Sequence, residues 1–177
     1  SHDSEVLSNI SMSMWINYVK PNKIMGETIV FGISTLDVYT GITTLHEETL
    51  SYHHNPCTYD CIERLITIHQ PAECLIVSNL NKNILDEIIS FIGLNNCKLH
   101  IIDKNNKESS LTKYAINSEK QVYQKEIFKN FYPELSEETI VSAIQDTHPM
   151  AVQSFVLLLE FINEHSPNMA TKLNIPL

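Results

Sequence analysis

The sequence predicts an α/β fold in which one mixed β-sheet, with three antiparallel strands followed by two parallel strands, is flanked by helices. Two observations lead to this prediction. In the first third of the chain, apolar residues alternate with polar ones or form β-branched runs, as they do in strands. From residue 61 onward, helical and strand-like stretches take turns, which is the order of parallel strands joined by helical crossovers.

Three predicted strands joined by short turns open the chain. Met12–Val19 alternates with period two, and Pro21-Asn22-Lys23 follows it with residues that favour a turn. The β-branched run Thr28–Val38 is typical of a central strand that is buried on both faces. Tyr39-Thr40-Gly41 predicts a tight turn, and a return strand over 42–48 completes an antiparallel meander.

The pattern then changes to alternating helices and strands. Four elements are predicted: a helix over 61–69, a strand over 74–77, a helix over 84–92 and a strand over 99–102. Pro71 is expected to stop the first helix, and Gly93 is expected to close the second in a left-handed conformation. The summed order, β-β-β-α-β-α-β, is that of the ribonuclease H-like fold.

The rest of the chain is expected to be a loop followed by helices. The polar stretch 103–117 predicts a long loop or linker, and helices are expected over 122–131, from Ser136 and over 149–163. The tail 166–177 is expected to make few contacts of its own. We therefore divide the chain into an N-terminal linker or cloning residues (1–11), a ribonuclease H-like domain (12–118) and a helical segment (119–177).

Composition narrows the function classes. The chain has 177 residues, 21 acidic against 12 basic side chains and a net charge of −9, which argues against a surface that holds nucleic acid through its phosphates. The apolar run Phe155–Phe161 is too short to cross a membrane, and we expect no signal peptide because the first residues are polar and acidic. The four cysteines form no CxxC pair, so we expect them to be reduced in an intracellular, non-secreted protein.

One candidate site is a two-metal nuclease centre of the kind that ribonuclease H-like enzymes build from carboxylates. Asp37 and Glu63 are the candidate ligands, with Asp103 after the last strand. Against this hypothesis, Ser78-Asn79 follows the strand where a third carboxylate is wanted. The alternative for Asp37 is that its carboxylate accepts hydrogen bonds from the amides of the turn that follows it.

A second candidate is a zinc site at His53, His54, Cys57 and Cys61, four potential ligands within nine positions. The spacing is not that of a zinc knuckle, and Cys61 is explained as a small hydrophobe on the buried face of its helix. We therefore assign no catalytic, cofactor-binding or metal-binding residue from the sequence.

Several motifs resemble the connector domain of the MutS mismatch-repair family. They are the strand and turn Ile33–Gly41, the helix–Pro–x–Glu–strand step Ile66–Val77, and His148–Val152 with Phe155–Phe161, which resemble the passage into the core or lever domain. Val156 and Leu157 stand where many relatives carry glycine. This departure indicates a divergent branch. The pattern Phe155–Glu160 and the following His165-Ser166-Pro167-Asn168 resemble the branch of the family found in large DNA viruses and a few mitochondrial genomes.

The resemblance implies a non-catalytic connector that links mismatch recognition to an ATPase core and offers a surface to a MutL-type partner. It implies no cofactor in this part of the chain, ATP and Mg in the parent protein, and DNA contact only through other parts of that parent. It also implies contacts with the neighbouring mismatch-binding and core domains, no membrane partner, and a location in the viral factory, cytoplasm or mitochondrion. The alternative is the metal-dependent nuclease that uses Asp37 and Glu63.

Overall fold

The fold is built on one five-stranded sheet. The computed structural model describes residues 8–52, 55–145, 148–167, 173–174 and 176. Within them the strands lie in the order β3-β2-β1-β4-β5. Their bounds are β1 Ile10–Val19, β2 Thr28–Asp37, β3 Thr43–Ser51, β4 Glu73–Ser78 and β5 Lys98–Ile102. β1, β2 and β3 pair antiparallel, and β4 and β5 extend the sheet in parallel, which confirms the predicted ribonuclease H-like fold class.

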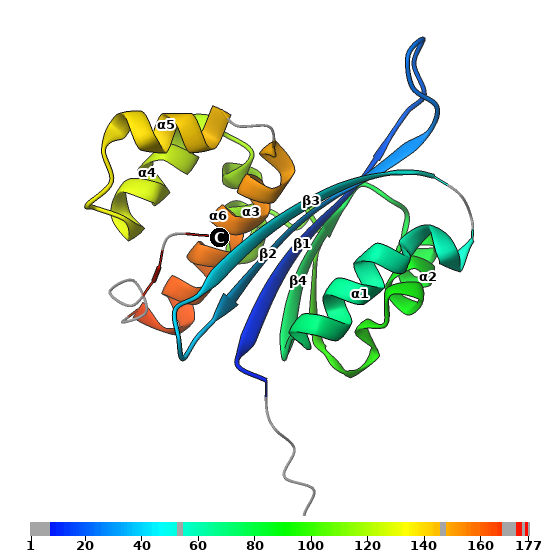
Figure 1. The fold of residues 1–177 in the computed structure, drawn as a ribbon, viewed down its shortest axis with the longest axis horizontal. Helices are drawn as coiled ribbons and strands as arrows, with labels where there is room; N and C mark the ends of the chain where they lie inside the picture. Colours follow the sequence, from blue (N-terminus) through cyan, green and yellow to red (C-terminus); the bar gives the residue numbers. More distant parts are fainter. Residues whose placement is uncertain (1–7, 53–54, 146–147, 168–172, 175, 177) are drawn as a thin grey trace, which may run out of the picture.

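Helices cover both faces of the sheet (Figure 1). One face carries α1 (Asp60–His69) and α2 (Lys82–Ile92), with short 3₁₀ turns at Pro56–Tyr59 and Leu94–Asn96. The other carries the remaining four helices, α3 Ser110–Ser118, α4 Gln121–Phe131, α5 Glu137–Gln145 and α6 Pro149–His165. The sheet is therefore the middle layer between two helical layers.

The alternation of β1 explains this layering. Met12, Met14 and Ile16 pack toward α1 and α2, whereas Trp15 packs with α6 on the opposite face. All four side chains are buried. Because β1 has buried side chains on both faces, it lies in the middle of the sheet rather than at its surface.

α6 crosses the sheet so closely that β2 needs a glycine beneath it. A Cβ placed on Gly32 would lie 2.3 Å from the carbonyl carbon and 2.3 Å from the carbonyl oxygen of Met150. Ser154 of α6 adds polar contacts in the same interface. Its hydroxyl donates to the carbonyl oxygen of Ser13 at 2.7 Å and lies 2.9 Å from the hydroxyl of Ser34. The N-terminal half of α6 is thus held against the centre of the sheet.

The predicted helix ends are close to the observed ones. Gly93 ends α2 at φ 82°, in the left-handed conformation expected of it. α1 ends at His69. The next residue, Gln70, stands just before Pro71, takes a left-handed φ of 44° and donates its amide to the carbonyl of Ile66. Gln70 therefore completes the cap that the sequence analysis had assigned to the proline alone.

The stretch 103–117 is not a simple loop, and here the sequence prediction is wrong. α3 begins at Ser110, and its Thr112, Ala115 and Ser118 are buried. Thr112 donates its hydroxyl to the carbonyl of Asp103 at 2.9 Å, which ties the helix to the end of β5. Small and polar residues form the buried side of this helix, so no apolar stripe announces it in the sequence.

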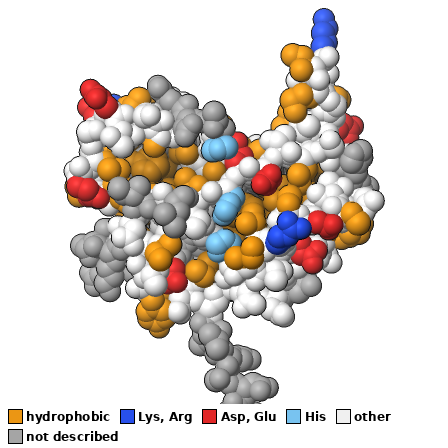
Figure 2. All heavy atoms as spheres, viewed as in Figure 1, with side chains coloured by type: hydrophobic (Ala, Val, Ile, Leu, Met, Phe, Trp, Pro, Cys, Tyr) orange, Lys and Arg blue, Asp and Glu red, His pale blue; other side chains and the backbone are white. Residues whose placement is uncertain are grey.

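The hairpin between β1 and β2 projects beyond the body of the molecule (Figure 1). The side-chain oxygen of Asn22 accepts the amides of Ile24 and Met25, each at 2.8 Å, which fixes the tip. Ile24 is 92% exposed, and Figure 2 shows hydrophobic and basic side chains on this projection.

Among the described residues, no helix has the length and apolar character needed to cross a bilayer.

Candidate binding groove

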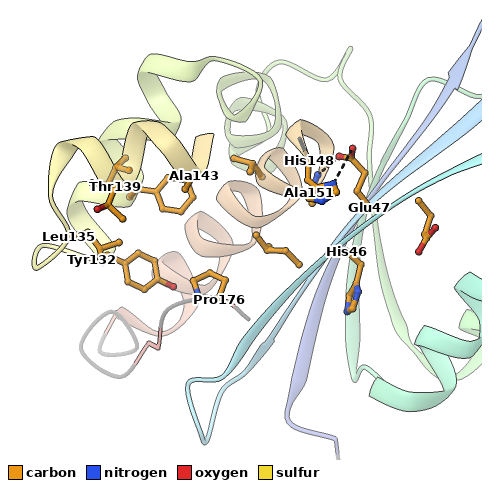
Figure 3. Close-up of a pocket in the computed structure, with 14 residues that line it drawn as sticks. His46, Glu47, Tyr132, Leu135, Thr139, Ala143, His148, Ala151 and Pro176 are labelled. Carbon is orange, nitrogen blue, oxygen red and sulfur yellow. Dashed lines mark hydrogen bonds and ion pairs between the residues drawn. The ribbon is translucent and has the colours of Figure 1, made fainter. Parts of the chain in front are cut away.

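A cavity of about 460 Å³ lies between β3 and the helices α4, α5 and α6 (Figure 3). Its walls are mainly apolar and come from segments far apart in the sequence. The main apolar lining residues are Leu45, Phe128, Tyr132, Leu135, Ile140, Ala143, Ala151 and Val152. This volume falls within the usual range for ligand sites, about 300–1,000 Å³. Figure 2 shows hydrophobic side chains reaching the surface in this region.

The cavity borders the edge of β3 rather than one of its faces. Four consecutive residues of this strand, 45–48, line it, although neighbouring side chains on a strand point to opposite faces. His46 shows this alternation, because its ring lies 5.9 Å from the ring of His69 on α1, while Glu47 points toward α6. β3 is an edge strand of the sheet, and among the described residues it pairs with β2 alone. We call the cavity together with this free edge the β3 groove.

One end of the β3 groove is polar. The Oε1 atom of Glu47 accepts the amides of Met150 and Ala151 at 2.7 and 3.0 Å, so it caps the N-terminus of α6. Nδ1 of His148 lies 3.9 Å from Oε2 of the same carboxylate (Figure 3). A carboxylate at this position satisfies amides that have no partner within the helix and interacts favourably with the helix dipole. Glu47 therefore joins β3 to α6 beside the cavity.

The other end of the β3 groove is closed by C-terminal residues. Asn174 donates its main-chain amide to the carbonyl of Gly41 at 3.0 Å, and its side-chain amide donates to the carbonyl of Thr40 at 3.3 Å. Its carbonyl accepts the hydroxyls of Thr43 and Tyr132 at 3.4 and 3.1 Å. Two residues further on, Pro176 lines the cavity. The tail was predicted to make few contacts, and these hydrogen bonds correct that prediction.

Tyr132 contributes both to the apolar wall and to this polar contact. Burial raises the pKa of its phenol to about 12, with the negative charge of Glu134 adding to the effect and a hydrogen bond with Thr43 opposing it. The phenol therefore keeps its proton near neutral pH and can donate it to the carbonyl of Asn174.

The structure does not assemble the predicted nuclease ligands into a metal centre. The Oδ1 atom of Asp37 accepts the amides of Tyr39 and Thr40 at 2.9 and 3.1 Å, as the alternative interpretation expected. Glu63 is exposed on α1, and Oδ1 of Asp103 accepts the amide of Asn105 at 2.9 Å. Among the described residues, no group of three or more His, Cys, Asp and Glu side chains is placed to hold a metal ion.

The zinc hypothesis cannot be followed at all four positions, because His53 and His54 lie outside the described residues. Cys57 is exposed, with its amide donating to the side chain of Asn55, and Cys61 is half-buried against the core on the α1 side. The β3 groove was not predicted from the sequence, because its residues carry no motif. The sequence signal that could have pointed to this groove is the acidic pair Glu47-Glu48, which follows the apolar Leu45 in the same strand.

Comparison with known proteins finds similarity to solved structures only. No family model matches the chain, and no curated protein matches it. The Holliday junction resolvase of fowlpox virus is similar at 17% identity and a TM-score of 0.45, over 88% of this chain and 99% of that one. A chain of the simian T-cell lymphotropic virus intasome, solved with PP2A regulatory subunit B56 gamma, is 12% identical with a TM-score of 0.36, over 77% of this chain and 47% of that one. The HTLV-2 integrase catalytic core domain in complex with magnesium is 13% identical with a TM-score of 0.29, over 78% of this chain and 83% of that one.

These findings contradict the resemblance to MutS, which is wrong, and with it the predicted connector role in mismatch repair. The similar structures are a resolvase and retroviral integrase proteins, and no sequence family supports MutS. The physical reason for the error lies in the motif. Asp37 accepts two turn amides and Gly41 has a φ of 74°, so Asp-x-x-Thr-Gly describes a stable turn rather than a family.

The same findings correct two further expectations. The resolvase and the integrase are enzymes by their names, which contradicts the expectation that this chain is not an enzyme. The integrase core was solved in complex with magnesium, which contradicts the expectation of no cofactor here, with ATP and Mg confined to a MutS parent. At these identities and TM-scores the likeness is one of fold, and no activity passes from those proteins to this chain.

Proposed function

We propose that this ribonuclease H-like chain binds an extended polypeptide segment in the β3 groove. The observation that carries the proposal is that an apolar cavity lies directly against a free strand edge. A strand edge offers unpaired amide and carbonyl groups to a further strand, while alternate side chains of that strand enter an adjacent pocket. The cavity supplies such a pocket beside residues 45–48.

The shape and chemistry of the groove support a polypeptide partner. Its wall is apolar along Phe128, Ile140 and Val152, which suits aliphatic side chains. Among the polar lining groups, those of Glu47 and His148 are engaged with α6 and with each other. The carboxylate of Glu48 is exposed to solvent, where its charge is screened by salt. Affinity would therefore come from main-chain hydrogen bonds and apolar burial, and we expect little dependence on salt.

A labelled peptide of alternating valine and threonine tests the proposal. The unaltered chain should bind it, and binding should slow amide hydrogen exchange within β3. A twin peptide, N-methylated at alternate positions, cannot donate the strand hydrogen bonds and should bind at least about tenfold more weakly. Equal binding of both peptides, or no protection in β3, would rule out strand addition.

A pair of α5 variants locates the peptide. Ala143 lines the cavity and is exposed, so Ala143→Phe should fill the cavity and weaken peptide binding roughly tenfold. Ser142→Phe is the matched control, because Ser142 is exposed on the same helix and is not among the lining residues. If both variants bind the peptide equally well, the peptide lies elsewhere.

A metal-dependent nuclease is the second candidate, and the ribonuclease H-like sheet order is the observation that favours it. Asp37 and Glu63 would carry the activity, assayed with labelled DNA or RNA and added Mg²⁺ or Mn²⁺. Asp37→Asn keeps an oxygen acceptor for the turn amides, and Glu63→Gln changes an exposed side chain, so both variants should fold. If the unaltered chain cleaves the substrate and both variants do not, this function is established. If the unaltered chain leaves the substrate intact, the nuclease hypothesis is wrong.

The partner that we propose is a protein rather than DNA. The net charge of −9 opposes phosphate contacts, so duplex DNA near physiological salt should bind no more tightly than about 10⁻⁴–10⁻⁶ M. Titration of labelled duplex with the full chain checks this expectation. A sub-micromolar complex would contradict it.

An intracellular setting is proposed from the cysteines. Cys57, Cys61, Cys74 and Cys97 are all free thiols in the structure. Burial raises the pKa of Cys74 well above its usual range, and burial also raises that of Cys97 to about 11, so both thiols resist oxidation. Thiol titration of the protein, denatured without reductant, should count all four. A disulfide among them would oppose this setting.

A further inference from the structure

We infer that the C-terminal residues Leu173, Asn174 and Pro176 form a strap that occupies one end of the β3 groove and competes there with a bound segment. This inference rests on the proposed function, since it concerns regulation of the same groove. Leu173 packs against the apolar core on the α6 side, Asn174 bonds to the start of β3, and Pro176 lines the cavity. Three described residues of the tail thus follow one path into the site.

The strap is held through its main chain at a single residue. Four hydrogen bonds converge on Asn174, and three of them use its main-chain amide or carbonyl. The partners are Thr40, Gly41 and Thr43 at the β2–β3 turn and Tyr132 just after α4. Asn174 therefore bridges the two walls of the groove, the sheet edge and the helical layer.

The direction of the strap shows how it would compete. Asn174 bonds to residues 40–43, and Pro176 lines the cavity beside residues 45–48, so the strap advances in the same direction as β3. Side chains of a strand bound to β3 would enter the cavity that Pro176 lines. Proline has no amide hydrogen, so Pro176 cannot continue a hydrogen-bonded ladder along the edge.

Competition within one molecule needs only weak contacts. A tethered segment faces its site at an effective concentration in the millimolar range, so it can suppress a weak external ligand. Removing one neutral hydrogen bond changes such an equilibrium by roughly two- to tenfold. A loosened strap should therefore produce a measurable gain in affinity for an added peptide.

Removing one hydroxyl group that bonds to Asn174 tests the inference. Tyr132→Phe removes the hydroxyl that donates to Asn174 and keeps the buried ring. We expect the alternating valine–threonine peptide to bind about two- to tenfold more tightly to this variant. Tyr59→Phe is the matched control, since Tyr59 is equally buried but lies on the α1 side of the sheet, and its affinity should stay within about twofold.

A second variant acts on the strap itself. Asn174→Pro removes both donors of Asn174, to Gly41 and to Thr40, and should raise peptide affinity at least as much as Tyr132→Phe. A peptide that binds and protects β3, but with no gain in either variant, would overturn the strap and leave the proposed function standing.

Hydrogen exchange gives a readout that needs no peptide. The amide of Asn174 should exchange slowly in the unaltered chain, because it is bonded to Gly41, and several-fold faster in Tyr132→Phe. An unprotected Asn174 amide in the unaltered chain would overturn the strap by itself. If the amide is protected but no peptide binds, the proposed function fails and the tail is only a structural contact.

Discussion

At the scale of single residues, Gly32 sets how closely α6 can approach the sheet. An added Cβ would lie within 2.3 Å of the backbone of Met150, a distance that the helix can relieve only by moving. We expect Gly32→Ala to lower the free energy of unfolding by about 1–3 kcal/mol, measured by urea denaturation. Gly26→Ala is the control, because a Cβ there meets nothing within 4 Å, and its effect should stay within about 0.5 kcal/mol. Equal stabilities of the two variants would show that α6 does not rest on Gly32.

Glu47 is the residue that joins the sheet edge to α6. Its carboxylate accepts two amides at the start of the helix, a role that helix-capping side chains usually fill from the same segment. We expect Glu47→Ala to lower the free energy of unfolding by about 0.5–2 kcal/mol. Glu48→Ala changes an exposed neighbour on the same strand and should have an effect within about 0.5 kcal/mol. Chemical denaturation of both variants shows whether the free energy of unfolding depends on the helix cap or only on the local negative charge.

At the scale of elements, periodicity predicted most strands and helices and failed where packing uses unusual residues. β1 was recognisable from its period-two alternation and β2 from its β-branched run, and both strands carry buried side chains on both faces. α3 was missed because its buried positions are Thr112, Ala115 and Ser118, which look like loop residues in a polar stretch. A helix that packs through small side chains close to a strand end leaves almost no apolar signal.

The contact between α1 and β3 should make stability depend on pH. Burial, with a smaller contribution from the nearby His46, lowers the pKa of His69 below its ordinary value of 6.5. The neutral ring is therefore favoured in the folded state, and the unfolded chain takes up the proton first as the pH falls. Stability should be lost as the pH drops through and below about 6.5. Urea denaturation at pH 7.5 and 5.5 should show a smaller loss for His69→Gln than for the unaltered chain, and equal losses would contradict this assignment.

At the scale of the whole molecule, the fold class followed from the order of elements, but the candidate site did not. The β3 groove joins residues 45–48 to side chains between 128 and 152 and to Pro176. No local pattern encodes a cavity whose walls meet only after α6 has crossed the sheet. From the sequence, Asp37 was a candidate metal ligand of a nuclease centre. In the structure its carboxylate accepts the amides of the turn that follows it. Spatial assembly, rather than residue type, defines the candidate site here.

The division of the chain at residues 118 and 119 stays a prediction, and truncation tests it. A chain ending at residue 118 would lose α4, α5 and α6 and leave the buried side chains Trp15, Leu36, Leu75 and Val77 without that layer. Exposing so much apolar surface removes the main favourable contribution to folding. We expect this fragment not to unfold cooperatively. Trp15 is the single tryptophan, so its emission reports directly on this face, and it should resemble that of the denatured full chain. A blue-shifted emission with a cooperative transition would instead establish residues 12–118 as a domain that folds without its helical layer.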